Sequence, residues 1–415
     1  MCDLPVSVVI VSRNRPRWLG RCLLAVGQLD YPVFEVVVVA CPLGRDIAQA
    51  AKLPVDVVVT VFDEANISQA RNIGISKARG DIVAFIDDDA VPEPTWLTHL
   101  VAPFEEASIA QAGGTTLGRN GISVQHAAAW VTYTGHSIAC PSPGTEPFIV
   151  PVKDGLHPRL HGTNMAFRRA VLLEHGGFDP RFSFYLDETD MTLRVAQAGG
   201  VTLCMPKAVV HHASGASAFR RTDRTPRRLY EIGASAGIFH QKHTPKHQIG
   251  AAQRAFMKDR RNWLLRHLQI GTLGPEEVVR LMEELTDGYD GSVTSDVAPS
   301  TWPKTAAPKS INRNDARQEN GFLVSRPGRR KSTVAKAINM VRDGAIVTIF
   351  DYDATTRYHR VEFTEDGYWV HAGGVFGREQ RDEPLFQSAD REKRVRSTLM
   401  RLSGIRSNSD LIAYN

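Results

Sequence analysis

Three consecutive carboxylates, Asp87, Asp88 and Asp89, follow a short apolar run and precede two prolines that prevent a strand from continuing. The run from Ile82 to Ile86 has the composition of a strand buried on both faces. Because one residue separates Asp87 from Asp89, an extended or tightly turned segment can direct both side chains toward one point. Hard divalent cations prefer such oxygen ligands, and a bound cation can hold a diphosphate. The alternative is a solvated acidic turn at a strand end.

A second acidic cluster contains Asp187, Glu188 and Asp190 and begins a helical pattern. Carboxylates in a first turn are favoured by the helix dipole, so a structural role explains Asp187 or Asp190 about as well as catalysis does. It does not account for Glu188, which follows a run of aromatic residues. His211 and His212 form a polar pair at a predicted strand end, and they are either ligands or solvated strand-end residues.

The elements that position these residues alternate between short apolar strands and helices. Strands are expected at residues 6–11, 36–40, 56–61 and 82–86. This alternation predicts an α/β fold with a Rossmann-like, mostly parallel sheet and flanking helices. Ligands of such sheets bind beyond the carboxyl ends of the strands, where Asp87 is expected. No GxGxxG follows the first strand, which argues against a dinucleotide-binding fold in the strict sense.

Length and composition limit the possible classes of protein. At 415 residues the chain is long enough for two or three domains. Its 50 basic and 45 acidic residues exclude a generally polycationic protein, and no nucleic-acid partner is expected. The five cysteines are scattered and contain no CxxC pair, which is typical of a reduced compartment. With no room for a signal peptide and no apolar run of the ~20 residues that span a bilayer, we expect a cytoplasmic protein.

The composition divides the chain into four expected parts. Residues 1–215 form the α/β domain, and residues 216–289 form an arginine-rich loop and a helical extension. Residues 290–331 read as a linker, and residues 332–415 as a small α+β unit of unknown role. The helix expected at 251–268 mixes aromatic and basic residues, so it either lies on an anionic bilayer or packs on the α/β domain.

Five segments together resemble the inverting glycosyltransferases of family 2, which have a GT-A fold. They are VSVVIVSRNRP, NISQARNIGISKARGDIVAFIDDDAVPEP, HGTNMAFRR, GGFDPRFSFYLDETDMTLRVAQAGG and VVHHASGAS, in the order that the family shows. Each is weak alone, and the five cover roughly the first half of the chain. Among family members, the bacterial rhamnosyl- and galactofuranosyl-type transferases of cell-surface polysaccharide are the most similar in character.

The resemblance implies a metal site and a catalytic base. Asp87 and Asp89 would be the DxD pair, with Asp89 the direct ligand, and His211 would complete the metal site or contact the diphosphate. Oxygen and imidazole ligands suit Mn²⁺ or Mg²⁺. Inversion needs one base to take the acceptor's proton, and Glu188 is the expected base. Its neighbours Asp187 and Asp190 remain alternatives.

The resemblance also implies which residues bind the donor. They are Arg13, Asn14, Arg71, Asp87, Asp88, Gly162, Asn164 and Arg168. The family commonly ends its second strand with an aspartate that binds the nucleotide base, whereas this chain has no carboxylate over residues 39–42. Base recognition would then differ or come from elsewhere, such as Asp63 or Glu64, and UDP, dTDP and GDP all remain open. Five arginines between Phe219 and Arg228 form either a solvated loop or a lid over the diphosphate.

The expected function is metal-dependent, inverting transfer of a sugar from a nucleotide-diphosphate sugar to a glycan or lipid-linked acceptor, with possible peripheral membrane contact on the inner face of the cytoplasmic membrane. One alternative is a nucleotidyltransferase, which would carry a glycine-rich phosphate loop after the first strand. The other is a catalytically silent module that binds a nucleotide sugar or a glycan. The combination of Asp87, Asp89, Glu188 and His211 argues against the silent module.

Overall fold

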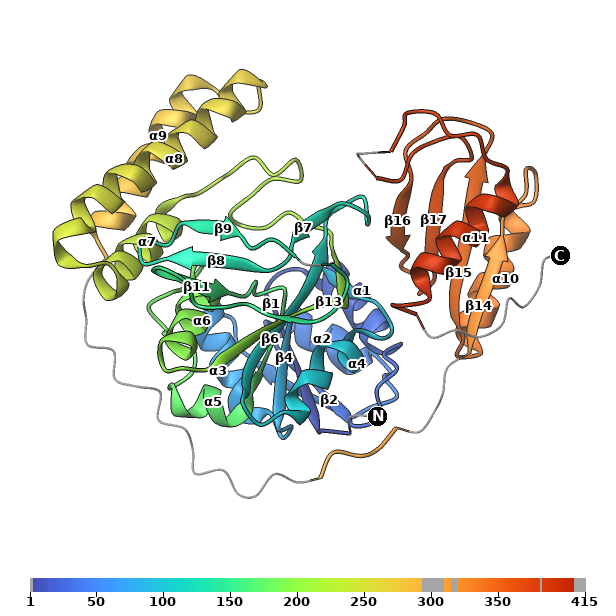
Figure 1. Ribbon diagram of the computed structural model, residues 1–415, viewed down its shortest axis with the longest axis horizontal. Coiled ribbons are helices and arrows are strands. Elements are labelled where there is room, and N and C mark those ends of the chain that lie inside the picture. Colours follow the sequence, from blue (N-terminus) through green and yellow to red (C-terminus); the bar gives the residue numbers. More distant parts are fainter. Residues whose placement is uncertain (1–2, 143, 293–309, 315–318, 381–382, 407–415) are drawn as a thin grey trace.

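The computed structural model describes residues 3–142, 144–292, 310–314, 319–380 and 383–406. An α/β domain comes first, followed by a long helical hairpin and a separate four-stranded unit (Figure 1). Much of the expected linker and the last residues of the expected C-terminal unit lie outside the described residues.

The α/β domain is built on a mixed ten-stranded sheet. Eight strands follow the order β10-β13-β6-β12-β4-β1-β2-β3, while β5 pairs with β13 and β7 pairs with β6. The pairs β1–β2, β1–β4, β2–β3 and β6–β13 are parallel, and β12 runs antiparallel to both of its neighbours. The strands are β1 (Val6–Ser12), β2 (Phe34–Ala40), β3 (Val57–Val61), β4 (Ile82–Asp87), β5 (Ala90–Pro92), β6 (Ile109–Leu117), β7 (Val124–His126), β10 (Phe148–Ile149), β12 (Asn164–Arg168) and β13 (Val201–His212). The predicted mostly parallel sheet is confirmed.

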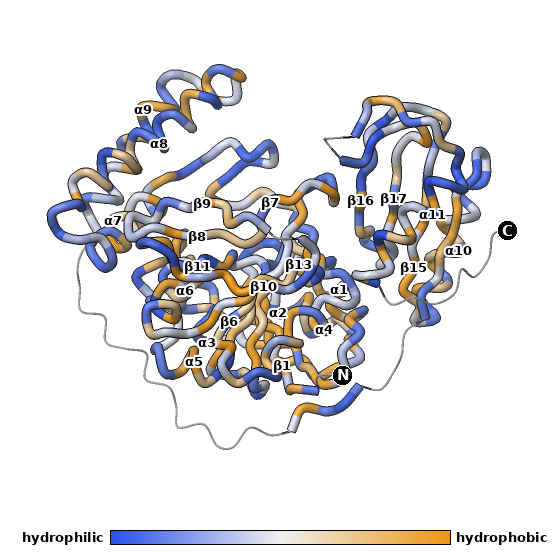
Figure 2. The backbone as a smooth tube through the Cα atoms, in the orientation of Figure 1, coloured by the Kyte–Doolittle hydropathy of each residue, from blue (hydrophilic) through white to orange (hydrophobic). Residues whose placement is uncertain are grey.

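Helices cover both faces of this sheet because the central strands are apolar on both sides. In β1, Val8 and Ile10 belong to the cluster formed with α1, α2 and α4, whereas Val9 belongs to the cluster formed with α3, α5 and α6. Figure 2 shows the hydrophobic residues concentrated along the central strands. The helices are α1 (Pro16–Val26), α2 (Pro42–Ala50), α3 (Ile67–Lys77), α4 (Trp96–Val101), α5 (Arg169–Glu174) and α6 (Asp187–Gln197). The predicted flanking helices are therefore confirmed as well.

A small sheet and three helices follow the core of the α/β domain. The sheet has the order β11-β8-β9, with β8 (Ala129–Thr132), β9 (Ser137–Ala139) and β11 (Leu156–Arg159). Helix α7 (Tyr230–His243) packs on α9 (Pro275–Asp290), and the intervening α8 (Ile249–Gln269) completes the hairpin. A side chain at Gly233 would meet the carbonyl of Leu285, so glycine permits this close helix packing. Among the described helices, including the 21-residue α8, none has the length and hydropathy needed to cross a bilayer.

The C-terminal unit has the strand order β14-β15-β17-β16. Its elements are β14 (Asn320–Val324), α10 (Arg330–Arg342), β15 (Ile346–Asp353), β16 (Arg360–Phe363), β17 (Trp369–Gly374) and α11 (Arg391–Leu402). Strand β14 lies inside residues 290–331, so that segment is not a linker throughout. Its short apolar stretch adjoins polar residues and acquires strand structure only by pairing with β15. Helix α10 packs on one face through Ala337, and α11 packs on the other through Val395.

Candidate active site

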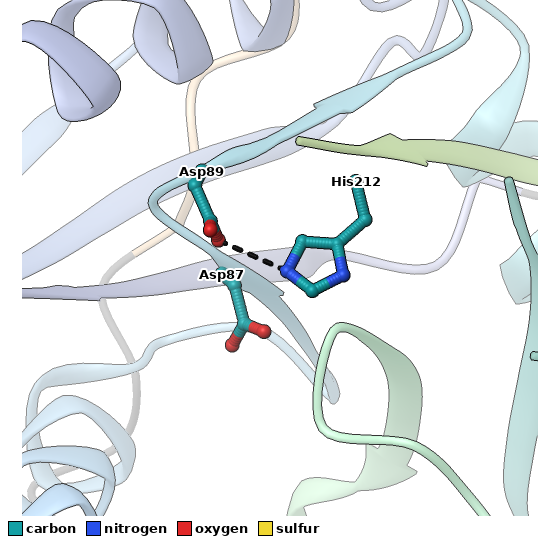
Figure 3. Close-up of side chains that lie close together, drawn as sticks. All are labelled: Asp87, Asp89 and His212. Atoms are coloured by element: carbon teal, nitrogen blue, oxygen red, sulfur yellow. Dashed lines mark ion pairs between the residues drawn. The ribbon is translucent and has the colours of Figure 1, made fainter. Parts of the chain in front are cut away.

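The three consecutive carboxylates lie where β4 ends in the middle of the sheet. The chain turns at Asp88 and Asp89 and enters β5, which pairs antiparallel with the end of β13. This register places His212 opposite Ala90, the residue after Asp89. Ligand atoms of Asp87, Asp89 and His212 all lie within 4.8 Å of one another (Figure 3). Two sequence-distant segments therefore converge on one point.

The histidine in this cluster is His212, and the predicted ligand His211 lies elsewhere. Successive side chains of a strand point to opposite faces, so only one member of the pair can face the carboxylates. His211 Nε2 lies 2.8 Å from Glu93 Oε1, whereas His212 Nε2 lies 3.2 Å from Asp89 Oδ1. The assignment of His211 to the metal site is corrected to His212.

Arginine side chains surround the two buried carboxylates of the turn. Arg15 donates to Asp88 Oδ1 at 2.7 Å and to Asp89 Oδ2 at 2.6 Å, and Arg220 lies 3.4 Å from Asp89. Burial opposes ionisation of Asp89, but His212 and Arg15 hold its pKa well below the usual range. Burial raises the pKa of Asp88 to about 7 despite the neighbouring Arg15. Asp89 is therefore the permanently charged member of this turn.

The turn forms one wall of a cavity of about 570 Å³, which we call the cluster cavity. The loop after β1 supplies Arg13 and Asn14, and Glu64 also lines the cavity. The arginine-rich loop contributes Arg220 and Arg228. A cavity lined by both carboxylates and guanidinium groups is suited to a phosphorylated ligand that binds together with a cation.

Of the two residues suggested for recognition of the nucleotide base, Asp63 and Glu64, only one lines the cluster cavity. Asp63 accepts a hydrogen bond from Arg13 Nε at 3.0 Å and is absent from the cavity lining, whereas Glu64 belongs to it. Of the two carboxylates considered for base recognition, the structure therefore favours Glu64.

The second acidic cluster divides into three different environments at the start of α6. Asp187 forms a buried ion pair with Arg71, and burial raises its pKa to about 7. Glu188 lies 3.1 Å from Arg159, and although burial opposes its charge, Arg159 and Arg71 lower its pKa. Glu188 is therefore the ionised carboxylate of the adjacent pair.

Asp190 is fully buried and interacts with a separate set of basic groups. It accepts from Arg194 Nε at 2.9 Å and lies 2.7 Å from Lys242 Nζ and 2.8 Å from His243 Nε2. Burial opposes its charge, but Arg194, His243 and Lys242 lower its pKa. These contacts tie α6 to α7, which gives Asp190 a structural role and leaves it no free oxygen to act as a base.

Arg71 connects the two acidic clusters. Its guanidinium contacts Asp187, lies 3.6 Å from Asp87 and donates to the carbonyl of Gly162 at 3.3 Å. Leu186, the residue before α6, has a φ of 65°, an uncommon conformation for a residue with a side chain. Such backbone outliers occur at functional sites, where surrounding structure enforces them. Here the conformation starts α6 so that Asp187 meets Arg71.

Two residues expected to bind the donor, the buried Asn164 and the half-buried Arg168, are bonded to other parts of the protein. Asn164 donates to the carbonyls of Thr115 and Ala208 and accepts from Trp96 Nε1 at 2.9 Å. Arg168 donates to the carbonyls of Phe104, Glu106 and Ile109. Neither side chain lines the cluster cavity. Because all these partners are protein groups that bind β12 to its neighbours, the two residues stabilise the sheet and are removed from the predicted donor site.

Sequence reasoning missed several residues that the structure places at the site. Ser12 and Arg15 bond to Asp88, and Thr163 donates to Asp87 Oδ2 at 2.6 Å. Arg159 pairs with Glu188 from β11. The signal for Ser12 and Arg15 was available, since the loop after β1 meets the end of β4 at one sheet edge. Arg159 and Thr163 carry no such signal.

The residues present fit a divalent cation. Asp87, Asp89 and His212 offer two carboxylates and one imidazole. The ligand atoms of these residues are close enough together to bind one ion. Such mixed oxygen and nitrogen ligands suit Mn²⁺ and Mg²⁺. Asp87 Oδ1 lies 3.6 Å from Arg71, and the Asp87 side chain is 28% exposed. The cluster can therefore hold a metal ion at the wall of the cavity.

Comparison with known proteins assigns the family. Residues 4–231, more than half of the chain, match the profile of the glycosyltransferase-like family 2, and the chain belongs to that family. The predicted family is thereby confirmed, and the α/β architecture described above agrees with the GT-A fold expected from it. The C-terminal unit lies outside the matched residues.

Individual relatives cover the chain only in part. A glucosyl-dolichyl phosphate glucuronosyltransferase of Haloferax volcanii is 32% identical over 187 residues, which are 42% of this chain and 56% of that protein. Glycosyltransferase AglE of the same organism is 31% identical over 116 residues, 26% of this chain and 38% of the relative. The chain thus spans about half of the first relative's length and less of the second's. The solved mannosyltransferase of Pyrobaculum calidifontis in complex with GDP-Man and Mn²⁺ shares 17% identity, with a TM-score of 0.41 over 70% of this chain and 88% of that one.

Proposed function

We propose that this protein is a metal-dependent inverting glycosyltransferase that moves a sugar from a nucleotide-diphosphate sugar to a glycan or lipid-linked acceptor. The observation that carries the proposal is the convergence of Asp87, Asp89 and His212 at the wall of a cavity of about 570 Å³. Family membership supports the reaction class, and the synthesis of cell-surface polysaccharide is the process that we propose for it.

The donor lies in the cluster cavity in this proposal. Asp87, Asp89 and His212 would hold Mn²⁺ or Mg²⁺, and the ion would supply positive charge that stabilises the leaving diphosphate. Arg220 and Arg228 contact the same diphosphate from the arginine-rich loop, since guanidinium groups match phosphate oxygens. Arg13 and Asn14 position the nucleotide, and Glu64 contacts its base. In this arrangement the arginine-rich loop acts as a lid over the diphosphate.

Glu188 acts as the base that takes the proton of the acceptor hydroxyl. Its lowered pKa keeps it charged at neutral pH, and charge is required before a proton can be accepted. Arg159 fixes one of its oxygens at 3.1 Å. Asp187 is paired with Arg71 and serves to hold that arginine between the two clusters. Asp190 has no role in proton transfer because its carboxylate is bound by three basic groups.

We place the reaction at the inner face of the cytoplasmic membrane. The aromatic and aliphatic residues of α8 pack on α9, which leaves its basic residues for contact with an anionic surface. Ile270 at the end of α8 is 71% exposed and would enter the interface. Sedimentation with vesicles of phosphatidylglycerol and phosphatidylcholine tests this contact, and Ile270→Asp should weaken it. Equal sedimentation with purely zwitterionic vesicles would contradict an electrostatic attachment.

The central experiment is a panel of UDP-, dTDP- and GDP-sugars incubated with Mn²⁺, Mg²⁺ or EDTA. We expect metal-dependent release of one nucleoside diphosphate by the native chain, and a strong loss in Glu188→Gln. Glu283→Gln is the matched control because it makes the same change on an exposed face of α9. Nucleotide binding without turnover in the native chain would favour the silent binding module. Release of pyrophosphate from a nucleoside triphosphate would favour a nucleotidyltransferase.

A further inference from the structure

A second cavity lies between the α/β domain and the C-terminal unit, and the proposed donor site does not use it. This interdomain cavity has a volume of about 540 Å³. Its walls come from α1, the loop at residues 118–121, the end of β13 and strand β16 of the C-terminal unit. Figure 1 shows β16 as the strand of that unit nearest to β7 and β13. The cavity therefore exists only in the chain that carries both units.

His212 lies in the wall of both cavities. On one side it faces Asp89 in the metal cluster, at 3.2 Å. On the other side it adjoins the space bounded by Val361 and Phe363 of β16. A ligand held in the interdomain cavity therefore ends next to the group proposed to activate the donor. This is the position that the second substrate of a transfer reaction must reach.

Hydrogen bonds join the α/β domain to the C-terminal unit around the interdomain cavity. The amide of Val361 donates to the carbonyl of Asn120 at 2.8 Å, and Gln28 Nε2 donates to the carbonyl of Gly367 at 2.6 Å. A side chain at Gly121 would overlap the backbone of Val361, so glycine is needed at this contact. The cavity is consequently a fixed feature of the assembled chain.

The lining of the interdomain cavity is basic. Arg21, Arg119 and Arg360 contribute cationic groups, and Glu362 is the sole carboxylate among the lining residues that the structure describes. Arg119 is anchored through hydrogen bonds to the carbonyls of Ala213 and Ser214. The charge at this surface thus favours an anionic ligand.

Arg21 places a partly buried guanidinium at this cavity. Its guanidinium carbon lies 4.6 Å from the ring centroid of Trp18, and its Nε is buried without a hydrogen-bond partner among the residues that the structure describes. Burial lowers the pKa of Arg21, while Glu362 acts in the opposite direction. An unsatisfied buried donor costs free energy, and an anion in the cavity would satisfy it.

We propose that the interdomain cavity binds an anionic group of the acceptor, a phosphate or a carboxylate, and that the C-terminal unit thereby contributes to acceptor selection. The inference rests on the proposed glycosyltransferase function, because it identifies the ligand as the second substrate. The guanidinium of Arg21 receives the anion at the base of the cavity, and Arg360 closes over it from β16. Arg119 maintains the shape of the wall that both ligands share.

The test measures binding of two simple probes, a hexose 1-phosphate and a hexuronate, by isothermal titration calorimetry of the full chain. Each titration is made with and without Mn²⁺ and saturating nucleoside diphosphate, so that occupation of the cluster cavity is controlled. Arg21→Met and Arg360→Glu should each weaken binding of the preferred probe at least tenfold. Lys336→Glu is the matched control, since it reverses an exposed charge on α10 of the same unit.

Each outcome has a definite reading. Binding of the phosphate probe alone identifies a phosphorylated acceptor, and binding of the hexuronate alone identifies an acidic sugar. Failure of the native chain to bind either probe overturns the proposal, as does binding that Arg21→Met and Arg360→Glu leave unchanged. Metal-dependent nucleotide binding is measured on the same variants and should remain native. Its absence from the native chain would instead count against the proposed function, whatever the probes show.

Discussion

Arg406 and Glu93 form a paired contact in which two guanidinium nitrogens donate to the two carboxylate oxygens, at 2.6 and 2.9 Å. Both side chains are 1% exposed. Arg406 also lies over the ring of Trp369, with 4.3 Å between the guanidinium carbon and the centroid, and Glu93 also contacts His211. Since Glu93 directly follows β5, this contact attaches the C-terminal unit to the strand that leaves the Asp87 cluster.

The Glu93 contact predicts a pH dependence of stability. Burial opposes ionisation, but Arg406 and His211 lower the pKa of Glu93 from 4.5 to about 2. The unfolded chain therefore binds more protons between these values, so stability rises with pH across this window and is fully present above 4.5. The shift corresponds to about 3 kcal/mol. Urea unfolding between pH 3 and 6 should give a shallower pH dependence for Glu93→Gln than for the native chain.

The control for this experiment is Glu283→Gln, which removes an exposed carboxylate and should keep the native slope. Parallel pH profiles for the native chain and Glu93→Gln would show that Glu93 does not change its protonation on unfolding.

Exchange of the two adjacent histidines should separate metal binding from domain attachment. Loss of residues that merely support a metal ligand costs about 10- to 100-fold in affinity, so His212→Asn should weaken Mn²⁺ binding more than tenfold. His211→Asn should leave Mn²⁺ affinity close to native and lower the unfolding free energy by about 1.5–3 kcal/mol, because His211 bonds to a charged Glu93. Calorimetric titration with Mn²⁺ and urea unfolding of both variants provide the two measurements.

The opposite result, weak metal binding in His211→Asn together with native binding in His212→Asn, would restore His211 as the ligand.

Glu188→Gln should mainly lower kcat, whereas Asp190→Asn should mainly lower stability. Glu188→Gln removes the proposed base and should lower kcat by about 10²- to 10⁴-fold, with little change in stability. Asp190→Asn removes the buried carboxylate charge that Arg194, Lys242 and His243 share and should lower the unfolding free energy by about 3–5 kcal/mol. Steady-state kinetics and thermal unfolding should therefore give opposite rankings of the two variants. Equal loss of kcat at unchanged stability in Asp190→Asn would reinstate it as a candidate base.

Gly162 should be intolerant of a methyl group because of Arg71. A Cβ at this position would lie 2.5 Å from Arg71 Nη2, and Arg71 would have to move away from Asp87 and Asp187. We expect Gly162→Ala to lower kcat at least tenfold, since small displacements of positioning groups are costly. Its unfolding free energy should fall by about 1–3 kcal/mol.

Gly20→Ala is the control for this change, because its Cβ would make an ordinary contact of 3.7 Å with Ile47. Native kcat in Gly162→Ala would show that Arg71 has no role in positioning.

The strands that carry the site were predictable because burial on both faces leaves a continuous apolar run. The run before Asp87 is the central strand β4, and the preceding strands were placed to within a few residues. Helix α2 and strand β14 were missed. Strand β14 depends on pairing with β15, a contact that residues 320–324 do not encode by themselves.

The positions of site residues were predictable where residues adjacent in sequence determine them. They were less predictable where they depend on the pairing of distant strands. Asp87 and Asp89 converge as a tight turn requires, whereas the choice between His211 and His212 depends on the register of β13 against β5. Asn164 and Arg168 are polar residues in a matching segment, but they bond to backbone carbonyls and to Trp96. A polar side chain that satisfies the interior cannot be told from one that binds a ligand until its partners are known.

His212 lines both cavities, although the rest of their walls comes from different parts of the chain. Residues 4–231 contain all the residues that line the cluster cavity, while residues 360–363 complete one wall of the interdomain cavity. Under the proposed function, a recombination event that replaced the C-terminal unit would change the acceptor and leave the proposed donor site unaltered. Under that proposal, exchange of the C-terminal unit alone would give enzymes with different acceptors, and Asp87, Asp88 and Asp89 would not have to change.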